Sequence, residues 1–157
     1  MALCLKEAFS SKWILTALSD FSGQLQARDI IRFLQYATKE SEKATYATYD
    51  DRLIMPTEIR NAVSKSSEEK IDEIKIEISA LSPIFDKLKK ANTDLKTLPF
   101  TKEHFNLTPQ EEEIMKREGY LIIENDKYYI PEIVRHALGF IYGKGARPKV
   151  LSLLFKR

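Results

Sequence analysis

Residues 23–41, GQLQARDIIRFLQYATKES, are the stretch from which the fold of the whole chain is interpreted. Apolar side chains recur there at helical spacing, so the segment is predicted to form one amphipathic helix with a broad buried face. The apolar positions are Ile30, Ile31, Phe33, Leu34 and Ala37. The polar positions expected on the other side are Arg28, Arg32, Gln35 and Lys39. Nothing in this pattern performs chemistry by itself, and alone it predicts only a helical, water-soluble protein.

Length and charge restrict the class of protein. The 157 residues suit one compact domain, or two small ones that share an interface. A chain of this length buries about two-thirds of its unfolded surface, so it requires no structural metal or disulfide. Glycine and proline are sparse and charges of both signs are interleaved, which is typical of an ordered, mostly helical protein. The net charge of +2 gives no overall case for a nucleic acid or an anionic membrane as partner.

The cysteine content and the N-terminal sequence favour a cytoplasmic protein. Cys4 is the only cysteine, which excludes an internal disulfide and is simplest to explain in a reducing compartment. The early apolar run is interrupted by Lys6 and Glu7, so a secretory signal is not expected. No uninterrupted apolar run approaches the length that spans a bilayer, and no membrane partner is predicted.

The first two-thirds of the chain are predicted to be all-helical. A helix is expected before the break at Gly23, and a loop follows the central helix, leading to a short extended piece before Pro56. Ser66 and Glu69 have the spacing of a capping box, which predicts that a separate helix begins there. The predicted segments are helix 2–19, helix 23–41, extended 52–55, helix 56–65, helix 66–79 and helix 81–90, with a connection over 91–100.

The last third has a different pattern. After a helical turn at 101–105, Thr108 is the predicted N-cap of a helix that Gly119 ends. A hairpin follows, with Asn125-Asp126 as its turn. Helix 131–142, a turn at 143–148 and helix 148–155 complete the chain. Helices followed by a two-stranded hairpin are the order of a winged-helix unit, so a mainly α fold is predicted, with an all-helical domain at 1–92 and a winged-helix-like domain at 98–157.

No pattern in the chain predicts a catalytic centre. The stretch 139–146, GFIYGKGA, is one residue too short for a phosphate-binding loop and has Gly145 where serine or threonine is needed. His104 and His136 are far apart and have no neighbouring cysteine, so neither is predicted to bind metal. No nucleophile elbow is present. The chain is therefore expected not to be an enzyme and to bind no cofactor or metal of its own.

The winged-helix-like order raises the question of DNA binding. The helix that would enter the major groove begins with Glu111, Glu112 and Glu113, which phosphates would repel. Basic residues lie elsewhere, at the hairpin tip and in the last segment, and are candidates for nucleic-acid or partner binding. They are Lys127, Lys144, Arg147 and Lys149. The basic segment suits phosphates, an acidic protein surface or the acidic helix 66–79 equally well, and an interaction module is the preferred interpretation.

Three stretches carry a resemblance to a known family. They are QARDIIRFLQYA (26–37), IMPTEIRNAVSKSSEEKIDEIKIEIS (54–79) and YYIPEIVRHALGFIYGKGARPKVLSLL (128–154). Together they resemble the C-terminal arm of bacterial STAND-like P-loop ATPases, in which a helical lid and a winged helix follow the nucleotide-binding core. The resemblance implies that Arg28 is a sensor arginine reaching the γ-phosphate of ATP, a task that suits a permanently charged, bidentate guanidinium. The alternative for Arg28 is an exposed arginine paired with a nearby carboxylate.

The chain departs from this family because it has no phosphate loop and no acidic strand to hold magnesium. It is therefore expected to be a fragment of a longer protein, or a detached arm that acts on a partner, and not to hydrolyse ATP. The leading hypothesis is a non-catalytic regulatory module that couples nucleotide state to a protein partner or a missing ATPase core by rigid-body movement. The alternative is a winged-helix DNA-binding regulator that uses the basic C-terminal segment.

Overall fold

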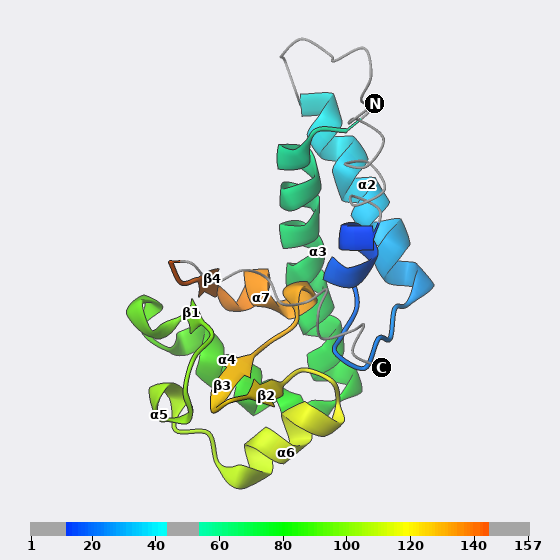
Figure 1. Ribbon diagram of the computed structural model, residues 1–157. Coiled ribbons are helices and arrows are strands. Elements are labelled where there is room, and N and C mark those ends of the chain that lie inside the picture. The colour runs from blue at the N-terminus through cyan, green and yellow to red at the C-terminus, as the bar shows by residue number, and fades with distance from the viewer. Residues whose placement is uncertain (1–11, 44–53, 145–157) are drawn as a thin grey trace.

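The structure, a computed structural model, describes residues 12–43 and 54–144 and is mainly helical (Figure 1). The long elements are α2 (Ala27–Lys43), α3 (Pro56–Glu77), α4 (Ser82–Lys90), α6 (Pro109–Arg117) and α7 (Glu132–Leu138), with a helical segment at 12–17 before them. The short ones are the 3-10 turns η1 (Ser79–Leu81) and η2 (Thr93–Leu95), helix α5 (Lys102–Phe105), and strands β1 (Thr97–Leu98), β2 (Ile122–Glu124), β3 (Lys127–Tyr129) and β4 (Ile141–Tyr142). Most of the predicted helix 2–19, the predicted helix 148–155 and much of the turn before it lie outside the described residues.

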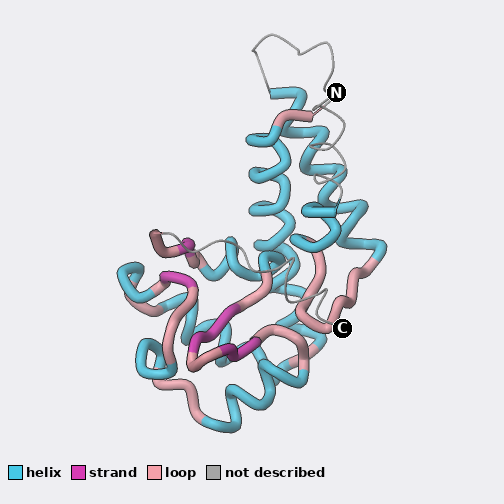
Figure 2. The backbone as a smooth tube through the Cα atoms, in the orientation of Figure 1, coloured by secondary structure: helices cyan, strands magenta, loops and turns pink. Residues whose placement is uncertain are grey.

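Helices α2 and α3 lie side by side and run in opposite directions (Figures 1 and 2). The predicted helix 23–41 is present as α2, but it begins at Ala27 and not at Gly23, and its buried face differs from the prediction. Ile31 and Leu34 are 57% and 51% exposed, whereas Arg32 is buried beside Phe33 and Ala37. The difference arises because α3 packs on a side of α2 that carries charged side chains as well as apolar ones.

Helix α3 is one continuous helix of 22 residues, so the prediction of two helices meeting at Ser66 was wrong. Buried positions recur along it without a break in phase at Ala62, Val63, Ser66, Ser67, Lys70, Ile71 and Ile74. The hydroxyl of Ser67 donates a hydrogen bond to the carbonyl of Ile133 in α7. Packing against α2 and α7 therefore keeps the helix regular through a sequence that, in isolation, has the pattern of a helix start.

Local sequence patterns in the last third form as predicted. The hydroxyl of Thr108 accepts a hydrogen bond from the N–H of Glu111 at 3.2 Å, while the Glu111 carboxylate accepts from the N–H of Thr108 at 2.7 Å. This reciprocal capping box starts α6. Strands β2 and β3 pair antiparallel. Their turn residues, Asn125 and Asp126, have φ of 51° and 58°, as a two-residue hairpin turn requires.

A second, parallel pair of strands was not predicted. Strand β1 pairs with β4, which replaces both the expected connection over 91–100 and the end of the expected helix 131–142. Helix α7 stops at Leu138 because Gly139 adopts a left-handed conformation with φ 78°, which frees the following residues to extend. The carbonyls of Lys96 and Leu98 accept hydrogen bonds from the N–H groups of Ile141 and Gly143. Pro99 has no N–H to donate, and these two bonds do not require one.

The buried apolar side chains form one cluster that draws on both predicted domains. In the last third it is aromatic: the ring of Phe100 lies 4.9 Å from Phe105, 5.4 Å from Tyr128 and 5.6 Å from Phe140 between centroids. Helix α3 contacts α7 directly, through Ser67 among others. The domain boundary between residues 92 and 98 stays a prediction, and the two parts pack against each other through this shared core.

The loop after the first helical segment docks closely on the end of α6, which makes Gly119 a sensitive position. Both Gly119 and Gly23 have positive φ, 78° and 76°, but a Cβ on Gly119 would lie 2.7 Å from the Ser22 hydroxyl and 3.2 Å from Asp20, whereas one on Gly23 meets nothing. We expect Gly119→Ala to lower the free energy of unfolding by about 3 kcal/mol and Gly23→Ala by about 1 kcal/mol, measured by urea denaturation. Equal losses of unfolding free energy in the two variants would show that the left-handed backbone conformation alone causes the destabilisation. The close contact of Gly119 with Ser22 and Asp20 would then contribute nothing.

Candidate functional site

Helices α2 and α3 are joined by four polar side-chain pairs, here called the polar ladder. Because the helices are antiparallel, each pair lies four residues further toward the C-terminus of α2 and four residues further toward the N-terminus of α3 than the pair before it. The pairs are Arg28–Glu77, Arg32–Glu73, Tyr36–Glu69 and Glu40–Lys65. Residues four apart lie on one face of a helix, so the ladder occupies a single stripe on each helix and fixes their register. It contains Arg28, the residue predicted to sense a nucleotide.

Arg32 is the buried centre of the ladder. Its side chain is only 9% exposed and contacts three carboxylates. The Nε lies 2.9 Å from Oε2 of Glu69, one terminal nitrogen lies 3.3 Å from Oδ1 of Asp29, and the other pairs with Glu73. An arginine whose donors are used in this way joins the two helices and is not available to an external ligand.

Arg28 occupies the end of the ladder and remains accessible. Its Nη2 lies 2.8 Å from Oε1 of Glu77 and 2.8 Å from Oε1 of Gln26, and its Nε lies 3.5 Å from Oε2 of Glu73. The hydrogen bond that the guanidinium donates to the Glu77 carboxylate raises the pKa of Arg28. The side chain is nevertheless 49% exposed. Arg28 therefore combines local carboxylate partners with an open surface.

A buried ion pair lies next to Arg28. Nζ of Lys70 is 2.8 Å from Oδ2 of Asp29, and the two side chains are 7% and 2% exposed. The same Nζ donates to Oε1 of Gln26 at 2.8 Å. The amide oxygen of Gln26 thus accepts hydrogen bonds from both the exposed Arg28 and the buried Lys70. Gln26 connects the surface end of the ladder to the interior.

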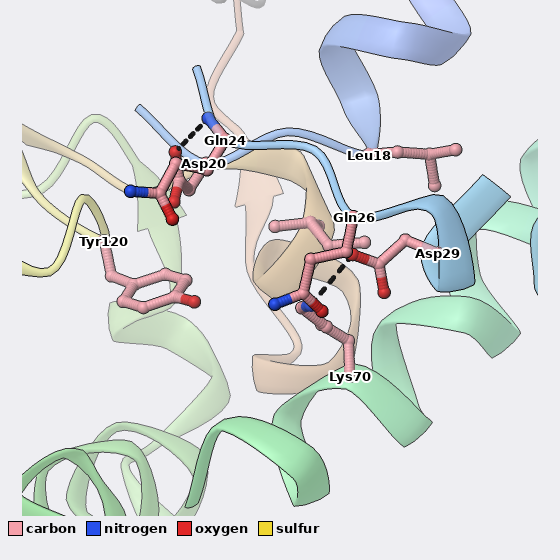
Figure 3. Close-up of a pocket in the computed structure, with 8 residues that line it drawn as sticks. Leu18, Asp20, Gln24, Gln26, Asp29, Lys70 and Tyr120 are labelled. Carbon is pink, nitrogen blue, oxygen red and sulfur yellow. Dashed lines mark hydrogen bonds and ion pairs between the residues drawn. The ribbon is translucent and has the colours of Figure 1, made fainter. Parts of the chain in front are cut away.

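A small pocket opens beside this pair, between the loop at 20–26, α3 and the end of α6 (Figure 3). Its polar lining comprises Asp20, Gln24, Gln26, Asp29, Lys70 and Tyr120. Burial raises the pKa of Asp20, whose carboxylate accepts from the N–H groups of Ser22 and Gln24. The cavity volume of about 30 Å³ has space for about two water molecules. The pocket is therefore too small to hold a nucleotide.

The basic residues predicted to bind a partner lie away from the ladder. Lys127 is exposed at the start of β3, next to the hairpin turn. Lys144 is exposed after β4. Arg147 and Lys149 lie outside the described residues. The two described lysines therefore belong to different elements of the fold.

The acidic start of α6 is largely used within the protein. Glu111 caps the helix and pairs with Nζ of Lys87 at 2.9 Å. Glu112 is buried and accepts a hydrogen bond from the hydroxyl of Tyr128 at 2.9 Å. Burial, together with this bond, raises the pKa of Tyr128 to about 12. Glu113 is the only one of these three glutamates whose side chain is exposed. The start of α6 therefore repels phosphate less than its sequence suggests.

The two histidines have local partners. Nδ1 of His104 accepts a hydrogen bond from the N–H of Thr101 at 2.9 Å and caps α5. His136 contacts both Arg135 and Glu132. Its pKa is lowered mainly by burial and further by the positive charge of Arg135. Within residues 12–43 and 54–144, no group of three or more histidine, cysteine or acidic side chains is arranged to hold a metal ion.

The sequence interpretation named Arg28 but missed its partners. Gln26, Glu73 and Glu77 were not candidates, and neither was the Asp29–Lys70 pair. A pattern was present: polar residues recur every four positions at 28, 32, 36 and 40, and again at 65, 69, 73 and 77. Two such stripes on neighbouring antiparallel helices indicate a ladder of pairs. The missing information was that these two helices pack against each other.

Comparisons with known proteins give no relative: the chain matches no protein-family model, no curated protein and no solved structure. In the part of the chain that the structure describes, no helix is both long enough and apolar enough to cross a membrane. The functional proposal therefore depends on the residues and their geometry.

The different burial of the two arginines predicts different effects on stability. Arg32→Met would leave Asp29, Glu69 and Glu73 without their shared cation, and we expect it to lower the free energy of unfolding by about 3 kcal/mol. Arg28→Gln removes an exposed pair and should leave the midpoint of urea denaturation unchanged. Circular dichroism during denaturation measures both. A tolerated Arg32→Met would show that the ladder does not hold the helices together.

Proposed function

We propose that the chain is a non-catalytic regulatory and interaction module that resembles the C-terminal arm of a P-loop ATPase and couples nucleotide state to a partner. The observation that carries this proposal is the position of Arg28. It is a half-exposed guanidinium in the first turn of α2, at the end of the polar ladder whose centre is the buried Arg32. That is where the family resemblance expects the sensor arginine. The nucleotide would be supplied by an ATPase core on another polypeptide segment.

The pairing of Arg28 is compatible with exchange for phosphate. Glu77, its 2.8 Å partner, is 46% exposed, and ion pairs at that exposure contribute little because water screens them. A terminal phosphate offers more negative charge and several oxygens in a geometry that matches the guanidinium fork. The start of α2 also favours an anion, through its unpaired N–H groups. Arg28 can therefore change partner without unfolding either helix.

The fold supplies a route from Arg28 to the last third of the chain. Arg32 binds α2 to α3, and α3 packs on α7 with the Ser67 hydroxyl bonded to the Ile133 carbonyl. Helix α7 follows the β2–β3 hairpin directly. The order of helix α6, hairpin and α7 supports assigning this region as winged-helix-like. A displacement at the nucleotide end would then reach it as a rigid-body movement.

A phosphate titration tests the role of Arg28. We expect Mg-ATP or inorganic triphosphate at millimolar concentration to shift the NMR resonances of the Arg28 side chain and of the backbone amides in the first turn of α2, because the guanidinium is exposed and cationic. Phosphate release from Mg-ATP should stay at the level of buffer alone, since no phosphate loop is present.

Two variants control this measurement. Arg28→Gln should abolish the response, while Arg60→Gln, which removes an exposed arginine elsewhere on α3, should preserve it. An unchanged spectrum of the native chain, or an equal loss in both variants, would contradict the proposal. Measurable ATP turnover would also contradict it.

DNA binding is the second candidate, and the exposed Lys127 at the hairpin is the observation that favours it. Lys116 and Arg117, exposed at the end of α6, add positive charge to the same helix-and-hairpin unit. A lysine at the tip of a hairpin is placed to contact a phosphate.

A mobility-shift assay on duplex DNA at two salt concentrations decides between the candidates. For a DNA-binding regulator, affinity should fall steeply with salt, because counterions are released, and should be lost when Lys144, Arg147 and Lys149 are changed to glutamate. For the regulatory module we expect no shift at physiological salt. Lys39→Glu, a single charge reversal on α2, is the control for a change of charge elsewhere in the chain.

A further inference from the structure

We propose that Glu77 is a built-in competitor for phosphate: its carboxylate occupies Arg28 and must leave before Arg28 binds the terminal phosphate of a nucleoside triphosphate. This inference rests on the proposed function of Arg28. It adds a regulatory contact at Arg28, in which the Glu77 carboxylate of the same chain occupies the guanidinium in place of phosphate.

The positions of the two side chains are unusual for their helices. Arg28 lies in the first turn of α2 and Glu77 is the last residue of α3. Each therefore carries the charge that the dipole of its own helix disfavours at that end. Helix formation does not explain this choice of residues, and the two charges pair with each other across the gap between the helices. Local rules are broken in this way most often where a residue serves a function.

Glu77 is also the carboxylate that can leave most easily. It is 46% exposed and is paired with Arg28. Glu73 is different, because it is 23% exposed and is shared with the buried Arg32. Release of Glu77 exposes a carboxylate to water and leaves no buried charge unpaired. Release of Glu73 would disturb the centre of the ladder.

Gln26 keeps the guanidinium in place during the exchange. Its Oε1 accepts from Nη2 of Arg28 and from Nζ of Lys70, both at 2.8 Å. Lys70 is in turn fixed by Asp29. When Glu77 departs, Arg28 retains this bond and stays at the surface end of α2. Gln26 is therefore a positioning residue for Arg28, and Glu77 is the competing anion.

Titration of inorganic triphosphate into the chain and its variants tests the competition, with the NMR response of Arg28 as the readout. Glu77→Gln should tighten binding by roughly three- to fivefold, the range that corresponds to one exposed ion pair. Glu68→Gln is the matched control, because it makes the same charge change at an exposed site on α3 outside the ladder, and it should leave affinity unchanged. Gln26→Leu should weaken binding, since Arg28 loses its positioning bond.

The outcomes separate this inference from the proposed function. If the native chain responds and Glu77→Gln binds no more tightly than Glu68→Gln, the competition is wrong while the sensor role of Arg28 stands. Should neither the native chain nor Glu77→Gln respond, both proposals fail. A response that appears only in Glu77→Gln would contradict the proposed function, because the native chain itself must respond to phosphate. Circular dichroism spectra that match the native chain show that each variant is folded.

Discussion

The pairing of Arg32 with Glu73, Glu69 and Asp29 is the interaction on which the arrangement of α2 and α3 depends. A buried guanidinium is costly unless carboxylates surround it, so the two helices are stable only in the register that brings these groups together. A shift of one residue would move the polar stripe off its partner. The apolar residues Phe33 and Ala37 supply burial, while the charges select one alignment.

That alignment determines which groups are available to a ligand. Arg32 and Lys70 are paired with carboxylates of the chain, and the pocket next to them has space only for water. Arg28, at the end of the same stripe, is left half-exposed. The proposed site is thus a consequence of where the ladder ends. The chemistry that we propose for it is the recognition of an anion.

The features that the sequence predicted well are those set by neighbouring residues. The Thr108 capping box and the Asn125-Asp126 turn depend on a few consecutive positions, and both form as expected. The same local logic failed at Ser66, where packing on α2 and α7 overrides a helix-start pattern. The pairing of β1 with β4 joins segments more than forty residues apart, so no local pattern could reveal it. Glu77 was missed for the same reason: it lies 49 residues from Arg28 in the sequence, and only the packing of α2 on α3 brings the two together.

The continuity of α3 has a mechanical consequence. Its 22 residues, at about 1.5 Å each, make a rod roughly 33 Å long that contacts α2 along its length and α7 on another side. A rod without a joint behaves as a lever: a tilt of about 5° at one end displaces the other by roughly 3 Å. Two helices meeting at Ser66 would absorb such a tilt at their junction. The unbroken helix carries it from one part of the molecule to the other.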